Sequence, residues 1–119
     1  MNHNFRELRI WKDAIELVVA SYKVANQLPD VEKYGLISQV YRSSASIPTN
    51  IAEGCGRGTD RELSRFLGFS LGSAFELETH LTVIGRVYPN VGTKELMKEL
   101  RRNQNFIFKF KKKLDDQNK

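Results

Sequence analysis

A proline inside an apolar helical repeat is the feature that most constrains how this chain can fold. Apolar or small residues recur at alternating spacings of three and four, the pattern of one helix face: Ile37, Val40, Ser44, Ile47 and Ile51. Pro48 lies within this pattern, where it removes a backbone donor and crowds the preceding turn, at about 3 kcal/mol in an ordinary helix. We therefore predict a helix kinked at Pro48. We expect the cost of the proline to be offset either by packing on both sides of the helix or by hydroxyl groups that satisfy the freed carbonyls. The candidate hydroxyls are those of Ser43, Ser44 and Ser46.

Glycines directly after this pattern predict where the helix ends. Gly54, Gly56 and Gly58 can adopt the left-handed conformation that terminates helices. The next four residues, Thr59-Asp-Arg-Glu62, have the sequence of a capping box. A second helix therefore begins at once, after a tight turn.

Similar signals predict four long helices joined by short connections. The first is capped by Asn4 with Glu7 or begins nearer Ile10, and Pro89-Asn90 stops the third. The other predicted ranges are Val31 to Gly54, Asp60 to Tyr88, and a fourth helix capped by Thr93 that runs to Asp115. This all-α pattern predicts a single domain over residues 1–119, an antiparallel up-down four-helix bundle.

The apolar positions indicate which helix faces form the core. In the first helix the predicted stripe is widened by Leu17, Val24 and Leu28, and consists of Trp11, Ala14, Ile15, Val18, Tyr22 and Ala25. In the third, a heptad-like seam contains Leu63, Phe66, Ser70, Ala74, Leu77, Leu81, Ile84 and Tyr88. Gly68 and Gly72 lie one turn apart in this helix, which predicts a close helix crossing there.

Four apolar residues fall outside these seams: Phe69, Phe75, Val83 and Phe108. Isolated exposed apolar groups are common on protein surfaces. Four of them beside a broadly apolar first helix favour a subunit interface instead. We therefore expect a homo-oligomer.

Several of these segments resemble one known family. The segments are Leu8-Arg-Ile-Trp11, Tyr34-Gly-Leu, Ser46-Ile-Pro-Thr-Asn-Ile-Ala-Glu-Gly54 and Gly72-Ser-Ala-Phe-Glu-Leu-Glu-Thr79. They are similar to the bacterial four-helix-bundle proteins named after reading frames in intervening sequences of 23S ribosomal RNA genes, and to the accessory variability protein of diversity-generating retroelements. The resemblance implies a homopentameric helical barrel, and relatives that bind nucleic acid and a reverse transcriptase. It places Trp11, Pro48, Asn50, Glu53 and Glu76 in the shared structural motif.

The composition excludes some protein classes and locates the charge. No apolar run approaches the ~20 residues that span a bilayer, and the first residues lack the layout of a secretory signal. With one cysteine, Cys55, no internal disulfide can form, so we expect a cytoplasmic protein without membrane contact. The formal net charge of +5 comes entirely from residues 94–119, where nine Lys/Arg face four Asp/Glu.

The fourth helix carries the clearest functional signal. Its predicted core side consists of Leu96, Leu100, Ile107, Phe110 and Leu114. The opposite side is cationic, with Arg102 at its edge, and consists of Lys94, Lys98, Arg101, Asn105, Lys109 and Lys112. Such a stripe can follow phosphates without reading sequence, or it is simply a solvated face.

A second basic cluster surrounds the start of the third helix. Arg57, Arg61 and Arg65 lie near a helix N-terminus, where backbone donors suit an anion. Asp60 and Glu62 lie among them, so structural ion pairing is the favoured interpretation. Arg42, on the second helix, joins either basic patch or neither.

The remaining polar residues do not indicate an enzyme. We interpret Asn50, Glu53, Glu76 and Glu78 as a buried or interfacial hydrogen-bond network, with Glu53 and Arg57 spaced for a salt bridge. Glu76 and His80 are too few for a di-iron site, and the glycines around Cys55 lack the Lys-Ser/Thr of a phosphate loop. We therefore expect no catalytic residue, metal or cofactor. The predicted function is non-enzymatic binding of RNA or DNA; the alternative is a scaffold that docks a protein partner.

Overall fold

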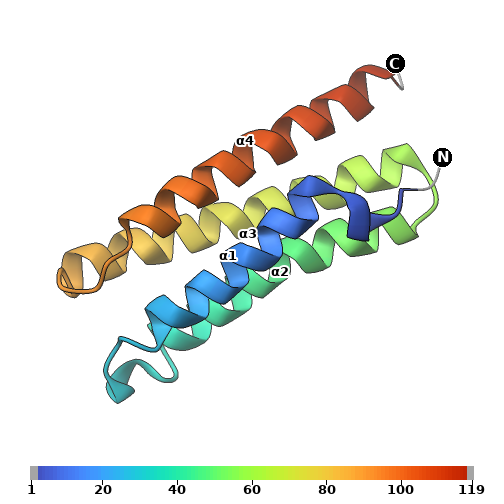
Figure 1. The fold of residues 1–119 in the computed structure, drawn as a ribbon. Helices are drawn as coiled ribbons and strands as arrows, with labels where there is room; N and C mark the ends of the chain where they lie inside the picture. Colours follow the sequence, from blue (N-terminus) through green and yellow to red (C-terminus); the bar gives the residue numbers. More distant parts are fainter. Residues whose placement is uncertain (1–2, 118–119) are drawn as a thin grey trace.

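In the computed structural model, which describes residues 3–117, the chain runs along the length of the molecule four times (Figure 1). Two short 3-10 helices accompany the four α-helices: η1 (Phe5–Glu7), α1 (Arg9–Ala25), η2 (Asp30–Glu32), α2 (Leu36–Gly56), α3 (Asp60–Val87) and α4 (Lys94–Gln117). Each α-helix packs against two neighbours, in the cyclic order α1, α2, α3, α4, and the molecule measures 47 × 20 × 20 Å. The described residues contain no strand. The prediction of an all-helical four-helix bundle is confirmed.

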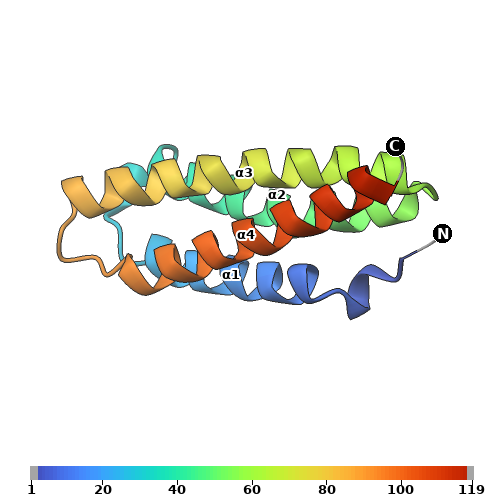
Figure 2. The same ribbon diagram turned by 90° about the horizontal axis from the view of Figure 1, so that it is seen from above.

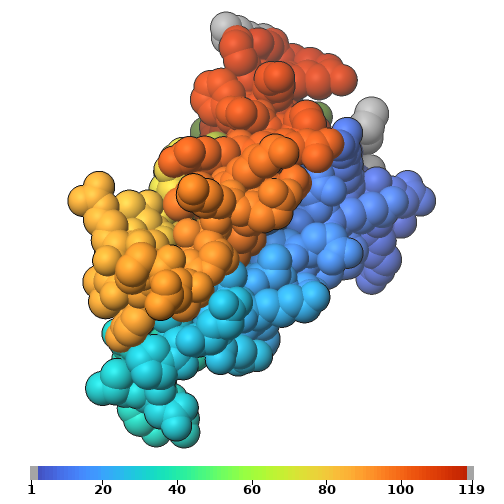
Figure 3. All heavy atoms as spheres, turned by 60° about the vertical axis from the view of Figure 1, so that its left-hand side comes forward, coloured from blue at the N-terminus to red at the C-terminus, as the bar shows by residue number. Residues whose placement is uncertain are grey.

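The fourth helix is set obliquely on the other three. Figure 2, in which α4 lies nearest the viewer, shows it running from the side of α1 toward that of α3. In the space-filling view of Figure 3, α4 (orange to red) lies across α1 (blue), and the segment that carries η2 (cyan) protrudes at one end. Because α4 contacts both α1 and α3, two grooves run along its flanks.

The start of α1 matches one of the two predicted alternatives, the one nearer Ile10, and the start of α2 differs from the prediction. Asn4 does act as a cap, but of η1: its side chain accepts a hydrogen bond from the backbone N–H of Arg6 at 3.2 Å, and α1 begins only at Arg9. The expected start of the second helix at Val31 is wrong, since α2 begins at Leu36. The reason is Gly35, whose φ of −111° and ψ of −112° interrupt the helical conformation after η2.

Helix α2 continues through Pro48 to Gly56. The hydroxyls of Ser43 and Ser44 donate to the carbonyls of Gln39 (2.7 Å) and Tyr41 (3.2 Å), not to that of Ser44, which the missing N–H of Pro48 leaves free. The offset therefore comes from packing. Pro48 is buried together with Ile47 and Ile51 of the same helix. Ser70 of α3 donates to the Ile47 carbonyl at 2.9 Å.

The turn after α2 depends on one of the three glycines. Only Gly58 has a positive φ, of 88°, so this residue makes the left-handed turn that the sequence assigned to any of the three. Thr59 then caps α3, since its hydroxyl accepts from the backbone N–H of Glu62 at 3.2 Å. Gly54 has a different role, because a Cβ atom there would lie 2.7 Å from the Cβ of Phe66.

The core confirms the predicted seam of α3 and corrects that of α1. All predicted seam residues of α3 are buried except Tyr88, which is half-buried. On α1 the buried residues are Ile10, Ala14, Leu17, Ser21, Val24 and Ala25. Ile15 and Tyr22, predicted to face the core, are exposed. The buried stripe is instead rotated toward Leu17 and Val24, which were predicted only to widen it. The expected close crossing at Gly68 and Gly72 is not found among residues 3–117: a Cβ placed on Gly68 would lie 3.5 Å from the Lys111 side chain of α4, an ordinary contact, and nothing lies within 4 Å of one placed on Gly72.

Candidate nucleic-acid interface

Helix α4 separates its apolar and cationic residues onto opposite sides. Its buried residues are Leu96, Leu100, Asn103, Ile107 and Leu114. The predicted stripe lies on the other side, and all of its members are exposed: Lys94, Lys98, Arg101, Asn105, Lys109 and Lys112. Asn103 is the one buried polar residue that the pattern missed; its amide donates to the Ile10 carbonyl at 3.2 Å. From Lys94 to Lys112, at 1.5 Å per residue, the stripe extends over about 27 Å of this helix.

One end of this stripe borders a groove between α3 and α4. The α3–α4 groove encloses about 550 Å³ and has Leu81 and Met97 among its apolar lining residues. Four cationic side chains line it: Arg86 of α3, and Lys94, Lys98 and Arg101 of α4. No acidic residue lines this groove, so its electrostatic potential is positive.

Arg86 was missed in the sequence, where it is an isolated basic residue near the end of a long helix. It meets the α4 cations because the short connection over residues 88–93 returns the chain beside α3. The turn signal at Pro89-Asn90 could have indicated this proximity. Which face of α3 the arginine occupies could be learned only from the packed helices.

The other flank of α4 has a different charge. The α1–α4 groove encloses about 560 Å³ and is lined by four acidic residues, Asp13, Glu16, Glu95 and Glu99, with two basic ones, Lys23 and Arg102. Arg102 pairs with Glu99 at 3.6 Å. The structure therefore places Arg102, predicted as the edge of the basic stripe, in a mostly acidic groove. The formal charges that line the two grooves therefore differ in sign: four basic and no acidic residues on the α3 side, and two basic and four acidic residues on the α1 side.

Ion pairs divide the ten predicted nucleic-acid-binding residues into two groups. Five pair with a carboxylate at 3.1–3.9 Å: Arg57, Arg65, Arg101, Arg102 and Lys112. Among the described residues, the other five have no carboxylate within 4 Å: Arg42, Arg61, Lys94, Lys98 and Lys109. Lys94 and Lys98, four residues apart, repel each other by a few tenths of a kcal/mol.

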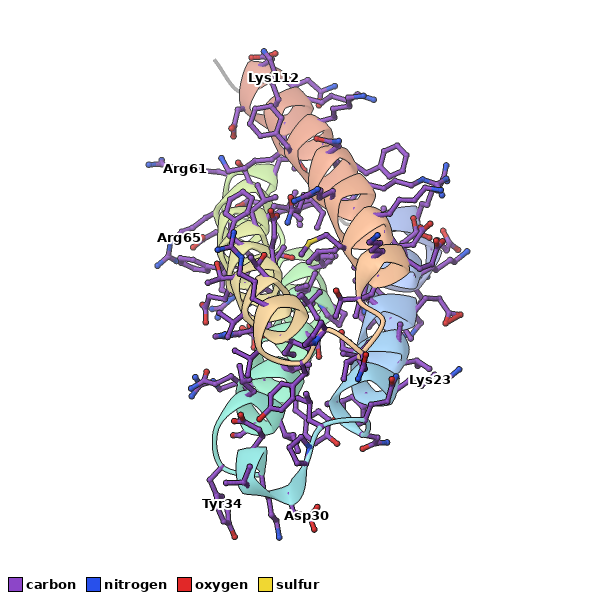
Figure 4. The ribbon with its side chains drawn as sticks, turned by 90° about the vertical axis from the view of Figure 1, so that its left-hand side faces the viewer. Lys23, Asp30, Tyr34, Arg61, Arg65 and Lys112 are labelled. Carbon is purple, nitrogen blue, oxygen red and sulfur yellow. The ribbon has the colours of Figure 1, made fainter. Side chains whose placement is uncertain are left out.

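The second predicted cluster is held mainly by its own neighbours. Arg57 pairs with Glu53 at 3.9 Å and lies 4.8 Å from the ring centroid of Phe66. Arg65 pairs with Glu62 at 3.5 Å. Figure 4 shows Arg61 and Arg65 projecting from the same side of α3. The favoured interpretation of structural pairing fits Arg57 and Arg65, whereas Arg61 has no acidic partner within the described residues.

Arg42 joins neither patch through a direct bond. It is exposed on α2, where its guanidinium donates to the side-chain oxygen of Gln39. α2 does not contact α4, so the α4 stripe and Arg42 lie on different parts of the bundle.

The predicted polar network is divided among separate contacts. Asn50 donates to the carbonyl (2.9 Å) and the hydroxyl (3.0 Å) of Ser46, which accepts from Ser73 of α3 at 2.8 Å. Glu53 and Glu76 are exposed, so for these two residues the buried alternative is wrong and the interfacial alternative stays a prediction.

Two other predicted polar or motif residues contact neighbouring elements. Glu78 accepts from two residues of α4, Gln104 at 2.9 Å and Arg101 at 3.3 Å. Trp11 is half-buried and meets Phe5 edge to face, with the ring centroids 5.2 Å apart. Both contacts join elements, so these two residues act in packing.

The remaining observations concern the single cysteine, metal ligands and membrane-spanning helices. Burial raises the pKa of the Cys55 thiol above its usual range. Residues 3–117 contain no group of three or more His, Cys, Asp and Glu side chains placed to hold a metal ion. No helix in this range has both the length and the apolar character needed to cross a membrane.

Comparison with known proteins identifies a family. Residues 6–110 match the family described as 23S rRNA-intervening sequence protein. The match includes all of α1, α2 and α3 and most of α4. No curated protein matches the chain.

Proposed function

The chain belongs to the family of 23S rRNA-intervening sequence proteins, and from this premise we propose that it is a non-enzymatic, homo-oligomeric protein that binds structured RNA or DNA. Its basic outer surface contacts the phosphate backbone, with little sequence specificity. The observation that carries the proposal is the α3–α4 groove, where Arg86, Lys94 and Lys98 converge without a carboxylate within 4 Å.

The electrostatic cost of placing these cations side by side favours an anionic ligand between them. Lys94 and Lys98 repel each other, and Lys94 also lies in the first turn of α4, where the helix dipole disfavours a cation by roughly 0.3–1 kcal/mol. A phosphate bound between the two helices would turn these unfavourable terms into attraction and release counterions.

Oligomerisation would repeat the basic surface. We propose that Phe69, Val83 and Val87, exposed along the side of α3 away from α4, form part of a subunit contact. The family resemblance supports five copies, which would present five α4 stripes to one long nucleic acid.

The test is a fluorescence-anisotropy titration of the purified protein with a hairpin RNA and a duplex DNA at several salt concentrations. We expect the logarithm of affinity to fall linearly with the logarithm of salt concentration, with a slope of several units. Replacing Lys98, Arg101 and Lys109 by Gln should reduce that slope by about 2–3 units on duplex DNA.

A matched control separates the stripe from the overall charge. Replacing Lys12, Lys23 and Lys33 by Gln removes the same formal charge from exposed positions outside α4. This variant should keep most of the affinity and slope. Equal losses in the two variants would contradict a site on α4, and no binding at ~50 mM salt would contradict the whole proposal.

A specific observation favours the alternative, a scaffold for a protein partner. Val31 and Tyr34, at the end turn that carries η2, are 83% and 89% exposed. Figure 4 shows Tyr34 and Asp30 projecting from this end of the bundle. An exposed aromatic at a protruding turn suits docking to another protein, for which a reverse transcriptase is the candidate that the resemblance implies. Replacing Tyr34 by Ala should then weaken that complex and leave nucleic-acid binding unchanged.

A further inference from the structure

Two exposed phenylalanines border the basic stripe on facing edges of α3 and α4. Phe75 is 54% exposed and Phe108 is 58% exposed. We propose that this edge binds single-stranded nucleic acid, with unpaired bases stacked on the two rings and phosphates held by Lys98, Arg101 and Lys109. The inference rests on the proposed function and specifies which form of nucleic acid the α4 stripe prefers.

Contacts between the helices place the two rings in register. Glu78 of α3 bonds Arg101 and Gln104 of α4, and farther along, Lys111 lies 3.5 Å from the Cβ position of Gly68. Phe75 precedes Glu78 by about one turn, and Phe108 follows Gln104 by about one turn. Both rings therefore lie in the stretch between these two contacts, about one turn apart along the bundle axis.

The surface of α3 beside Phe75 is open. Gly72 lies one turn before Phe75 in the same stretch of α3, and nothing comes within 4 Å of a Cβ atom placed on it. Within residues 3–117 neither Phe75 nor Phe108 stacks on another ring or lies beneath a guanidinium or ammonium group. Their faces are available to a flat apolar ligand.

A third exposed phenylalanine lies in a different setting. Phe69 is 46% exposed, but it meets the ring of Phe66 edge to face at 5.3 Å, and the Arg65 guanidinium lies 5.2 Å from its centroid. It is also one turn from Ser73, which bonds Ser46 of α2, so it lies on the side of α3 away from α4. Phe69 is therefore a matched control for an exposed ring that does not border the stripe.

A surface that offers both exposed aromatic rings and cations should bind a single-stranded nucleic acid better than other polyanions. A duplex hides its base faces, so it can use the lysines and arginines but not the rings. A single strand can use both, because every base has a face that stacks on an aromatic side chain and the backbone follows the adjacent cations. An acidic peptide offers charge but no flat rings.

The experiment measures anisotropy for three labelled probes of equal length: oligo(U), oligo(dT) and a blunt duplex. Phe75→Ala and Phe108→Ala should each lower the affinity for both single strands about tenfold and leave the duplex affinity within about twofold. Phe69→Ala, at a ring of the proposed subunit contact that does not border the stripe, should leave the ratio of single-strand to duplex affinity unchanged. Phe108→Trp should retain single-strand binding, because it restores a stacking surface.

Several outcomes would overturn this inference. They are unchanged single-strand affinity in both alanine variants, an equal loss for duplex and single strands, and a fall in oligomer mass by light scattering, which would make the rings subunit contacts. Phenylalanine-dependent binding of a poly-glutamate probe without such dependence for oligo(U) would also overturn it. Steep salt dependence on duplex with no effect of the rings would overturn the inference and support the proposed function, whereas no binding of any nucleic acid at ~50 mM salt would overturn both.

Discussion

Gly54 of α2 lies directly against Phe66 of α3, at a point where the two helices leave no room for a side chain. A Cβ atom on Gly54 would lie 2.7 Å from the Cβ of Phe66 and 3.0 Å from a terminal carbon of Leu63. The first of these atoms is fixed to the backbone of α3, so a rotamer change cannot relieve the overlap. The glycine sets how closely α2 and α3 approach.

Gly54→Ala should therefore destabilise the protein by about 1–3 kcal/mol, because α2 and α3 must move apart. Gly72→Ala is the matched control: it is also inside a helix but has open space at its Cβ position, so it should stabilise by up to about 1 kcal/mol through helix propensity. Urea unfolding monitored by circular dichroism measures both changes. Equal effects of the two substitutions would contradict the close approach at Gly54.

Tyr88 provides a prediction at high pH. Its hydroxyl donates to the Glu32 carboxylate at 2.6 Å. This hydrogen bond, with desolvation and the negative charge of Glu32, raises the pKa of Tyr88 above its ordinary value of 10.0. A raised folded-state pKa means that the contribution to stability is complete below about pH 10 and is lost as the pH rises through the raised value.

We expect the free energy of unfolding to fall as the pH rises above about 10 in the wild type, and to fall less in Tyr88→Phe. Glu32→Gln should lower the pKa of Tyr88 toward its ordinary value, because the carboxylate acceptor and its charge are removed. Phenolate absorbance, compared with that of Tyr88→Phe, follows this one titration. An unchanged titration in Glu32→Gln would contradict the assigned cause.

Asp115 provides the corresponding prediction at low pH. The hydroxyl of Ser64 donates to its carboxylate, and Lys111 donates at 3.0 Å, and these two bonds lower the pKa of Asp115 below 3.8. A lowered folded-state pKa means that the contribution is complete well above pH 3.8 and is lost as the pH falls through the lowered value.

Asp115→Asn should therefore reduce the loss of stability on acidification from pH 5 to pH 2, and the Asp115 carboxyl should titrate below its ordinary range by NMR. Ser64→Ala should raise that pKa, since it removes the largest cause. If the Asp115 titration is the same in Ser64→Ala as in the wild type, the hydrogen bond between α3 and α4 is not the cause.

The sequence predicted a helix well where its cap, its apolar periodicity and its stop signal all indicate the same range. On α3, the Thr59 cap, the apolar seam and the Pro89 stop all indicate the same helix, and its range is Asp60–Val87, one residue shorter than predicted. On α1, apolar residues occur on more than half of the circumference, so periodicity could not fix the phase. The core position Ser21 is polar and reinforced the wrong choice, which placed Tyr22 inside.

The candidate site was less predictable, because it depends on how helices align. The cationic side of α4 follows from its own sequence, as a single helix defines it. The α3–α4 groove needs the register between two helices, which brings Arg86 to Lys94 and Glu78 to Arg101. Two of the four outward apolar residues that favoured a subunit interface, Phe69 and Phe75, lie on different sides of α3.

Glu78 limits the charge available to a ligand, and this leads to the last prediction. Its carboxylate accepts from Arg101 at 3.3 Å and from Gln104 at 2.9 Å, beside the α3–α4 groove. Glu78→Gln removes one negative charge and releases the guanidinium, while an amide oxygen can still accept from Gln104. Affinity for nucleic acid at low salt should rise severalfold, and the salt slope should steepen by about 0.7 units on a single strand. Stability should change by less than about 1 kcal/mol, since an exposed ion pair contributes little.

Glu99→Gln is the matched control: it frees Arg102 in the α1–α4 groove, so it should change the affinity less. Anisotropy titrations of both variants at two salt concentrations measure the difference. An equal gain in both would mean that the ligand senses only net charge, and a loss in Glu78→Gln would mean that the Glu78–Arg101 pair itself orients the arginine for binding.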